Sequence, residues 1–421
     1  MMGCRAYVLD NAQDDLRNSF EQGDFEYSRE LLSKFDQKDI YKSKDQVLYN
    51  LEYGTVLHFS GDYDSSSVAF SDAENQIESL YTKSISQGIQ SLILSDNALA
   101  YDGEEYENIY LNAFKTLNYM HLEDWEGALV ESRRIALKLE QLDIRLNGLS
   151  SIFAKQDSTN IADWTPKKAN IQSSALGRYL STILYAKTGK ADDARIEFDR
   201  LKRSVTEQET IRRYNGPSAN ELPDLTDTRS YNVVLSSFTG FAPAKVQNDI
   251  RTFFGEEADI YLKFSFPELF LFDTEVANVK VTVNGKDEHY LDMIEEMDVV
   301  AAEVYEAKQP IIYGRALARA VLKSVGARSI RKKAQKQSDG LGFLAGVLSI
   351  LGQEVSEKAD LRGWQTLPGQ AWTQVLRLPE GDHTVKIEYL SREGFTLFEE
   401  IQTLEVDEST ELKLIESIYS N

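Results

Sequence analysis

The chain has 421 residues, with 46 basic and 68 acidic side chains that give a net charge of −22 at pH 7. This acidic balance excludes a general affinity for nucleic acid or for an anionic membrane surface. A hydrophobic fraction of 42% and a charged fraction of 27% are typical of a globular protein, and the length predicts two or three domains of about 100–200 residues each. The longest strongly apolar, uncharged run, 340–352, is shorter than the roughly 18 residues that a membrane-spanning helix needs.

The only cysteine, Cys4, lies beside a glycine near the start of the sequence. One cysteine excludes an internal disulfide and a zinc site built from several thiolates. Myristoylation is excluded because that signal places glycine directly after the first Met, whereas Gly3 is the third residue. Two interpretations remain: Cys4 is a surface thiol, or it receives a lipid, since "MGC" resembles the last residues of a bacterial lipobox. The second interpretation makes 1–9 a lipid-anchor segment.

The region 10–212 repeats a pattern of helix, tight turn and helix. Its turns resemble those of the tetratricopeptide repeat, in which glycine makes the turn and a small residue lets two helices approach closely. The spacing is irregular, against a period of about 34 residues in that family. We therefore predict a tetratricopeptide-like helical domain over 10–212. The aligned positions are Gly23, Gly61, Glu123 and Gly189 at the turn, Phe25, Tyr63, Trp125 and Ala191 two residues later, and Ser28, Ser66, Ala128 and Ala194 three residues further on.

The region 213–255 breaks this pattern, because it contains prolines and many turn-forming residues. We interpret it as a linker leading into a second domain, and we expect the two halves to be separable there. From 256 to 421 the hydrophobic period becomes two, which indicates strands. Asn284-Gly285 and Glu380-Gly381 are typical of turns, and a helical stretch from about 290 to 361 interrupts the strands. The second domain is therefore predicted to be α+β, resembling a β-sandwich with a helical insert.

Enzyme and cofactor signatures are missing from the sequence, including His-Glu-x-x-His, Gly-x-Ser-x-Gly, Gly-Lys-Ser/Thr and Gly-x-Gly-x-x-Gly. The acidic stretch 286–298 could be drawn as a metal site around His289. Its carboxylates Asp292, Glu295 and Glu296 are more simply the solvated face of a helix. We expect no catalytic residue, no metal and no cofactor.

A basic stripe is predicted on a helix that starts near residue 315. Arg315, Arg319 and Lys323 recur every four residues and share one face. Two interpretations are open: the stripe neutralises acidic residues of the same protein, or it binds an external anionic partner. We slightly favour the partner. The apolar run 340–352 that follows is expected to be a buried helix or turn, with a membrane or partner contact as the alternative.

A short loop before a strand contains Asp360, Arg362 and Trp364. An ion pair between Asp360 and Arg362, backed by Trp364, would order this loop. We favour a structural corner, and we keep the three residues, with the basic stripe, as tentative partner-binding residues.

Several stretches together resemble a family of bacterial envelope lipoproteins whose biochemical function is unassigned. The match is carried by the order of "NALAYDGEEYENIYLNAFKTLNYM", "ALVESRR", "GFAPAK", "FSFPEL", "QPIIYGRALARAVLK" and "ADLRGWQTLP", which covers nearly the full chain. The resemblance implies a lipid on Cys4. Because Arg5 rather than Asp follows, it also implies an outer-membrane lipoprotein that faces the periplasm. It implies no catalytic residue.

These observations lead to a binding protein as the first hypothesis: a lipid-anchored periplasmic scaffold whose helical concave face holds a protein or peptide. We expect such a scaffold to support cell-wall or envelope assembly. One alternative is an enzyme that acts on an envelope polymer through the second domain, with Asp360 and Arg362 as its polar pair. Another is a soluble tetratricopeptide-type adaptor. A deep pocket with convergent carboxylates at Asp360 would favour the enzyme, and a shallow groove in the helical half would favour the scaffold.

Overall fold

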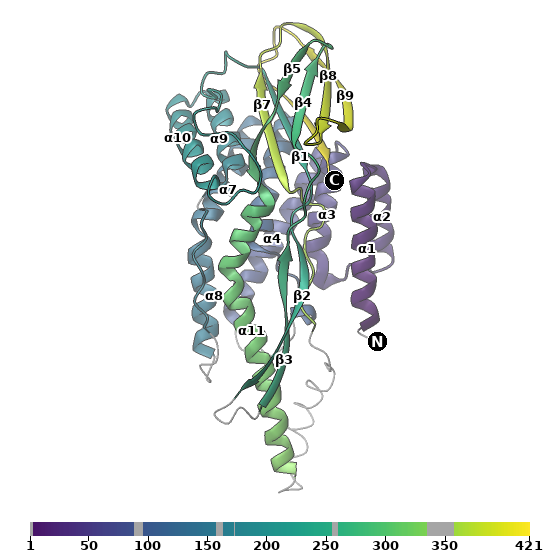
Figure 1. The fold of residues 1–421 in the computed structure, drawn as a ribbon, viewed down its shortest axis with the longest axis vertical. Helices are drawn as coiled ribbons and strands as arrows, with labels where there is room; N and C mark the ends of the chain where they lie inside the picture. Colours follow the sequence, from purple (N-terminus) through teal and green to yellow (C-terminus); the bar gives the residue numbers. More distant parts are fainter. Residues whose placement is uncertain (1–2, 88–95, 157–162, 172, 255–259, 335–357) are drawn as a thin grey trace.

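A computed structural model describes residues 3–87, 96–156, 163–171, 173–254, 260–334 and 358–421. Helices dominate the N-terminal half and β-sheets the C-terminal part (Figure 1). The helices of the first half are α1 (Gly3–Glu21), α2 (Phe25–Gln37), α3 (Gln46–Phe59), α4 (Tyr63–Gln87), α6 (Glu105–His121), α7 (Trp125–Glu140), α8 (Leu142–Gln156), α9 (Ala175–Lys187) and α10 (Ala191–Gln208), with short 3-10 helices η1 (Ser43–Asp45) and η2 (Asp96–Ala98).

The four predicted tight turns are confirmed, and they share one backbone geometry. The turn residues Gly23, Gly61, Glu123 and Gly189 all have positive φ, at 70°, 81°, 57° and 74°. In the first turn the Asp24 amide donates to the Ser19 carbonyl and the Gly23 amide to the Phe20 carbonyl. This pair of bonds is a Schellman motif, and the same two bonds recur in the other three turns. The helix pairs α1–α2, α3–α4, α6–α7 and α9–α10 therefore share one turn geometry, although the turn at Glu123 lacks glycine.

The small residues predicted beside the turns lie at close helix contacts. Ser28, Ser66, Ala128 and Ala194 are each completely buried. Ser66 Oγ donates to the Gly54 carbonyl on the paired helix at 2.7 Å. A larger side chain at these positions would push the two helices of a pair apart.

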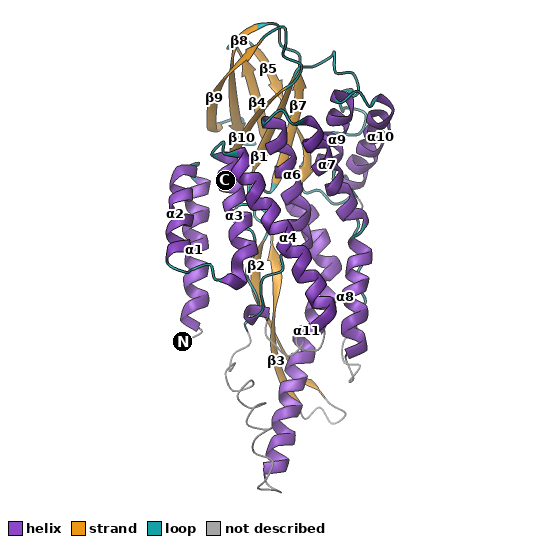
Figure 2. Ribbon diagram, turned by 180° about the vertical axis from the view of Figure 1, so that it is seen from behind, coloured by secondary structure: helices purple, strands orange, loops and turns teal. Residues whose placement is uncertain are grey.

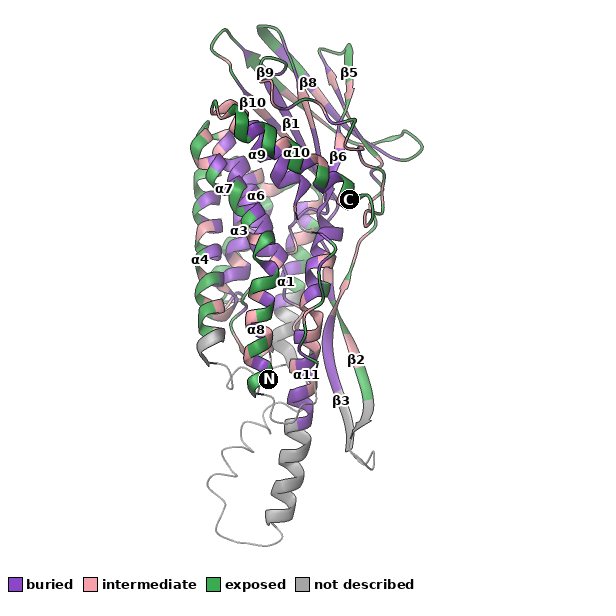
Figure 3. Ribbon diagram, turned by 90° about the vertical axis from the view of Figure 1, so that its left-hand side faces the viewer, coloured by how far each residue is buried: buried purple, intermediate pink, exposed green. Residues whose placement is uncertain are grey.

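In the pairs α3–α4, α6–α7 and α9–α10 the two helices differ in exposure (Figure 3). The first helices, α3, α6 and α9, are buried on nearly every side. The second helices, α4, α7 and α10, leave one face open, where Val68, Val130 and Ile196 are 62%, 50% and 50% exposed. We call the two sets the inner and the outer helices. A helix that is covered all round must be packed on a second layer.

That second layer is built from two four-stranded sheets and a two-stranded ribbon (Figure 2). The first sheet has the order β10-β1-β7-β6, with β1 parallel to β10 and antiparallel to β7. The second sheet is antiparallel, in the order β5-β4-β8-β9. The strands are β1 (Val233–Thr239), β2 (Ala244–Phe254), β3 (Ile260–Phe270), β4 (Asn278–Val283), β5 (Asp287–Tyr290), β6 (Asp292–Glu296), β7 (Gln370–Leu376), β8 (Gly381–Leu390), β9 (Thr396–Val406) and β10 (Lys413–Tyr419).

The first sheet is the middle layer of the molecule, because its two faces contribute to different cores. Val233 and Leu235 of β1 pack against the second sheet, together with Val281 and Ile387. On the opposite face, Val234 and Phe238 join the cluster formed by the helices. All seven residues of β1 are consequently buried.

The predicted linker 213–255 does not interrupt this core. Leu225 is fully buried in the cluster of the helices, and Tyr231 Oη donates to its carbonyl at 2.8 Å. The end of the predicted linker forms β1 and all of β2. The helical half and the first sheet therefore share one hydrophobic core across the expected boundary.

The expected helix over 286–298 is wrong. Residues 287–290 and 292–296 form β5 and β6, and Asn284-Gly285 makes the predicted turn, with φ of 52° and 69°. Glu295 and Glu296 are 0% and 2% exposed, not solvated. Pairing with β7 fixes this segment as a strand, and donors from other segments compensate its buried carboxylates.

The helical insert begins later than predicted, with α11 (Met297–Ala334). This helix runs beside the β2–β3 ribbon (Figure 1), where Phe264 and Phe266 pack on Ala316 and Ala320. In the described part of the chain, no helix combines the length and the apolar character that crossing a membrane requires.

Candidate functional site

The predicted site residues fall into two groups. Cys4 lies in the first turn of α1 and Lys323 in α11, but their side chains are outside the described residues, as is the run 340–352. The other five, Arg315, Arg319, Asp360, Arg362 and Trp364, lie where α11, the loop after 357 and the N-terminal part of α6 meet. We call the ion pairs at this place the central ion cluster, made of Asp45, Asp96, Glu104, Lys245, Lys308, Arg315, Arg319, Asp360 and Arg362.

The described part of the basic stripe is paired within the protein. Arg315 contacts one carboxylate oxygen of Asp96 at 2.6 Å, and Arg319 contacts the other at 2.8 Å. Arg319 is only 5% exposed. Burial would raise the pKa of Asp96, but Arg315 and Arg319 hold the pKa of this carboxyl well below its usual range. These two arginines neutralise a carboxylate of their own chain, so our preference for an external partner at this stripe loses its basis.

Arg362 joins three segments. Its guanidinium contacts Asp360 at 2.6 Å, which confirms the predicted pair, and Asp45 of η1 at 2.8 Å. It also donates to the Asp96 carbonyl at 2.9 Å. The aromatic ring beneath it is Tyr101, at 5.2 Å, rather than the expected Trp364. Asp360 and Asp45 raise the pKa of Arg362 against the opposing effect of burial.

Trp364 has a separate role, because it enters the aromatic core of the inner helices. It is 2% exposed and packs on Phe70 and Phe114, with ring centroids 5.6 and 5.8 Å away. Its indole N–H donates to Thr55 Oγ1 at 2.8 Å, and its backbone amide donates to Glu107 at the same distance. Trp364 therefore fixes the loop onto α3 and α6.

A second carboxylate of the central ion cluster, Glu104, precedes α6 and holds two lysines. Lys245 of β2 forms an ion pair with it, and Lys308 of α11 lies at 3.1 Å. Burial would raise the pKa of Glu104, but these two lysines lower it to about 2. Tyr101 lies between the two halves of the cluster: its ring faces both Lys245 and Arg362, and its hydroxyl donates to Glu107.

This geometry fits a structural junction better than acid–base chemistry. A general acid or base needs a pKa near the working pH, whereas Asp96 and Glu104 have lowered values and remain ionised. The cavity lined by Glu104 and Lys308 has a volume of about 20 Å³, which holds one water. The charged side chains of the central ion cluster therefore form ion pairs with one another.

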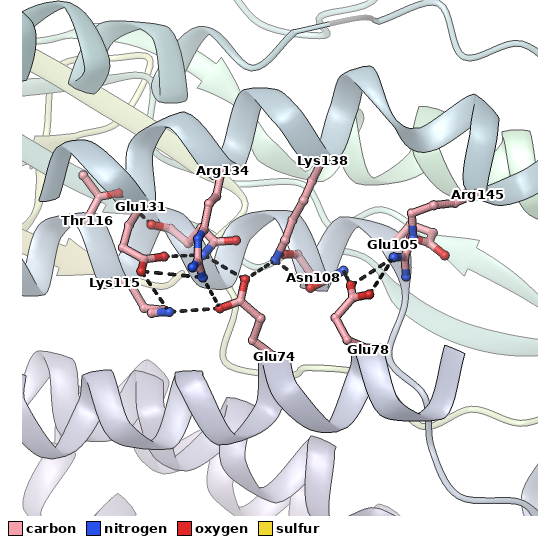
Figure 4. Close-up of polar contacts among 11 residues, drawn as sticks. Glu74, Glu78, Glu105, Asn108, Lys115, Thr116, Glu131, Arg134, Lys138 and Arg145 are labelled. Carbon is pink, nitrogen blue, oxygen red and sulfur yellow. Dashed lines mark hydrogen bonds and ion pairs between the residues drawn. The ribbon is translucent and has the colours of Figure 1, made fainter. Parts of the chain in front are cut away.

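A second charged network clamps α4 to the neighbouring helices (Figure 4). Glu74 accepts from Lys115 at 2.9 Å, Arg134 at 3.0 Å and Lys138 at 2.7 Å. Burial would raise the pKa of Glu74, but Lys138 and Lys115 lower it to about 2. Burial lowers the pKa of Lys138 to about 8, although Glu74 opposes this shift. One turn along α4, Glu78 pairs with Arg145 at 2.9 Å.

A third buried group joins β10 to the inner helices. Glu416 of β10 contacts His58 Nε2 at 3.0 Å and His121 Nε2 at 2.8 Å. His58 Nδ1 faces Asn118 Oδ1 at 2.6 Å, and the ring of Tyr63 stacks on His121. Burial would raise the pKa of Glu416, but His58 and His121 lower it to about 2. Two histidines that are far apart in the sequence thus share one carboxylate.

A groove in the helical half has a volume of about 420 Å³ and lies between the end of α7, the start of α8, α9 and α10. Arg178, Arg200 and Glu140 line it. Within the described ranges, no group of three or more His, Cys, Asp or Glu side chains is placed to hold a metal ion.

Sequence reasoning found the arginines of the central ion cluster but missed their partners. Asp45 and Asp96 lie in the short 3-10 helices η1 and η2, and Glu104 directly precedes α6. Nothing in their local sequence marks them. Four of the six stretches that carry the family resemblance contain residues of the central ion cluster, among them Glu104, Lys245 and Arg362. Those four stretches therefore meet in space around the start of α6. Comparison with protein-family models, with curated proteins and with solved structures finds no match.

Proposed function

We propose that this protein is a lipid-anchored scaffold of the bacterial cell envelope that faces the periplasm, and that its helical half is a tetratricopeptide-like frame. The observation that carries the proposal is the cover on the inner helices. Phe238 of β1 packs on Phe59 of α3 and Phe114 of α6, and Glu295 of β6 accepts from the Leu176 amide of α9. The frame therefore uses its inner face to hold its own C-terminal half.

This arrangement changes where an external partner can bind. The concave face that we expected to hold a peptide is filled by β1, β6 and the loop at Trp364. Partners must instead reach the outer helices, the sandwich or the groove between α7 and α10. The outer helices keep one face open and so offer a surface for other proteins.

The enzyme alternative has less support than the scaffold. Its polar pair, Asp360 and Arg362, is engaged with Asp45, and Arg362 is 6% exposed. A catalytic arginine must reach a substrate. The groove in the helical half is the feature that we expected of a scaffold.

The envelope assignment rests on Cys4 and on the resemblance to envelope lipoproteins. A chain with a net charge of −22 has no general attraction to an anionic membrane, so stable attachment needs another signal, such as a covalent lipid. A lipid on Cys4 would place the attachment at the first turn of α1.

Cell fractionation tests this proposal directly. The protein should be expressed with its complete upstream coding region, as wild type and as Cys4→Ser. We expect wild type in the outer-membrane fraction and Cys4→Ser in the periplasmic fraction. Gly3→Ala, which keeps a small residue before the cysteine, is the control and should fractionate as wild type. Equal distribution of wild type and Cys4→Ser would overturn the anchored scaffold and favour the soluble adaptor.

A further inference from the structure

Strand β9 forms one edge of the second sheet and pairs along its length with β8. It has 11 residues, whereas the other edge strands of the two sheets, β5, β6 and β10, have 4, 5 and 7. The β10 edge is also occupied, since Glu416 contacts two histidines and Lys413 contacts Glu123 at 2.6 Å. Among the described residues, β9 is thus the longest open strand edge of the sandwich.

Apolar side chains are exposed on this open edge. Ile401, in the middle of β9, is 61% exposed, and Phe395, directly before the strand, is 72% exposed. Natural proteins usually protect an edge strand with charged side chains, proline, a bulge or short length. The register of β9 shifts by one residue near its start, where Leu397 has no partner on β8, but the pairing is regular from Phe398 to Val406. A long edge with an exposed isoleucine is the type of surface to which an extended peptide adds as a further strand.

The faces of β9 follow from its register. Phe398 stacks on Tyr419, Leu404 packs on the core between the sheets, and Gln402 donates to the Glu416 carbonyl at 2.7 Å. These three residues therefore face inward. Because successive side chains of a strand alternate, the outward face is the row Glu399, Ile401, Thr403 and Glu405. All four residues are exposed.

The edge is also strongly acidic. Between Arg392 and Lys413 the sequence contains no basic residue. Acidic side chains alone could serve only to keep other strands away. Ile401 weakens the explanation that the acidic residues only keep other strands away. An exposed isoleucine in the middle of β9 attracts apolar groups to the edge that those residues would protect. The acidic residues of this stretch are Glu393, Glu399, Glu400, Glu405, Asp407, Glu408 and Glu411.

We propose that β9 binds an extended, basic peptide segment of a partner protein, which adds to the second sheet as a fifth strand. Lysine or arginine side chains of the peptide lie opposite Glu405 and opposite Glu399, which also contacts Lys386 of β8 at 2.8 Å. An apolar side chain between them lies opposite Ile401. Backbone hydrogen bonds supply affinity, and the alternating charged and apolar positions supply specificity. This inference deepens the proposed scaffold function by naming a partner class.

A peptide titration with the purified protein tests the site independently of cell location. The probe is a fluorescein-labelled, capped peptide Lys-Thr-Val-Thr-Val-Thr-Lys, with Glu-Thr-Val-Thr-Val-Thr-Glu as the charge-reversed comparison. Fluorescence anisotropy should show saturable binding of the lysine peptide that weakens as salt rises. Ile401→Lys should weaken binding at least tenfold. The matched control is Ile144→Lys on α8, where the isoleucine is 73% exposed, and it should bind as wild type.

Methyl NMR of the isoleucine side chains locates the bound peptide. We expect the lysine peptide to shift Ile401 and to leave Ile144 unchanged. Absence of saturable binding, equal binding of the two peptides, or an unchanged affinity in Ile401→Lys would overturn the proposal. A concentration-dependent dimer that Ile401→Lys abolishes, without peptide binding, would identify a second copy of this chain as the occupant and would also overturn it. None of these failures would alter the fractionation result, so the two proposals fail separately.

Discussion

The inner helices α3, α6 and α9 and the outer helices α4, α7 and α10 have the same turns but different surroundings. The outer helices keep one face open, as Val68 and Val130 show. The inner helices bury even charged side chains, such as Glu52 and Glu107, both 0% exposed. This difference shows that the C-terminal half contacts the inner helices through polar as well as apolar groups.

The buried carboxylates Glu52 of α3 and Glu107 of α6 contact the C-terminal half. Glu52 accepts from the Gln365 amide at 3.0 Å and from Thr366 Oγ1 at 2.9 Å. Burial raises the pKa of Glu52 to about 7, although these bonds oppose the shift. A carboxylate in such a place is costly unless donors reach it, and here the donors come from a loop more than 300 residues away.

The largest effect on stability is expected from Arg362→Met. The substitution leaves Asp45 and Asp360 without their cation, and breaking a buried pair typically costs about 3–5 kcal/mol. Urea denaturation measures the loss. Arg195→Met, on outer helix α10, removes an arginine that is 71% exposed in its ion pair with Asp192. That control should cost no more than about 1 kcal/mol. Equal losses would contradict the distinction between the inner contact and the outer surface.

A smaller loss is expected from Glu74→Gln. The change removes the negative charge that Lys115 and Lys138 share, and a hydrogen bond to a charged group contributes about 1.5–3 kcal/mol. Glu126→Gln is the matched control, since Glu126 is 69% exposed in its pair with Lys190. The same denaturation assay compares the two. A control that loses as much as Glu74→Gln would show that the network of Figure 4 adds nothing beyond a surface pair.

The acid side of the stability profile should depend on the carboxylate between the two histidines. The pKa of Glu416 falls from its ordinary 4.5 to about 2 in the folded state. Its contribution is therefore complete above about pH 4.5 and is lost as pH falls toward 2. Glu416→Gln should flatten the pH dependence of the free energy of unfolding in this window. An identical pH profile for wild type and variant would exclude this carboxylate as a contributor.

The smallest effect is expected on the outer surface. Ile144→Ser, at a position that is 73% exposed, should change the free energy of unfolding by no more than about 0.5 kcal/mol. A loss of several kcal/mol would show that α8 is covered by something that the described residues do not include.

The sequence predicted local features better than long-range ones. The turns at Gly23 and Gly61 could be found because a positive φ favours glycine, a local requirement. The pair of Asp360 and Arg362 was found because two residues separate them. The partner Asp45 could not be found, because no local pattern connects it to Arg362.

The wrong prediction over 286–298 has a physical cause. Acidic residues at helical spacing usually face solvent, but Glu295 receives Tyr110 Oη at 2.7 Å, Ser174 Oγ at 2.9 Å and the Leu176 amide at 3.1 Å. These donors come from α6 and from the start of α9. Only the assembled core makes a strand with buried carboxylates stable there.

The helical half and the first sheet share one core, so we expect them to unfold together. Hydrogen-exchange mass spectrometry under rising urea tests this most directly, by comparing the amides of α9 in the helical half with those of β1 in the first sheet. Since the core crosses the predicted boundary at Leu225, we expect both sets to converge on the same free energy of opening. Two distinct free energies, with one set exchanging while the other stays protected, would contradict the shared core.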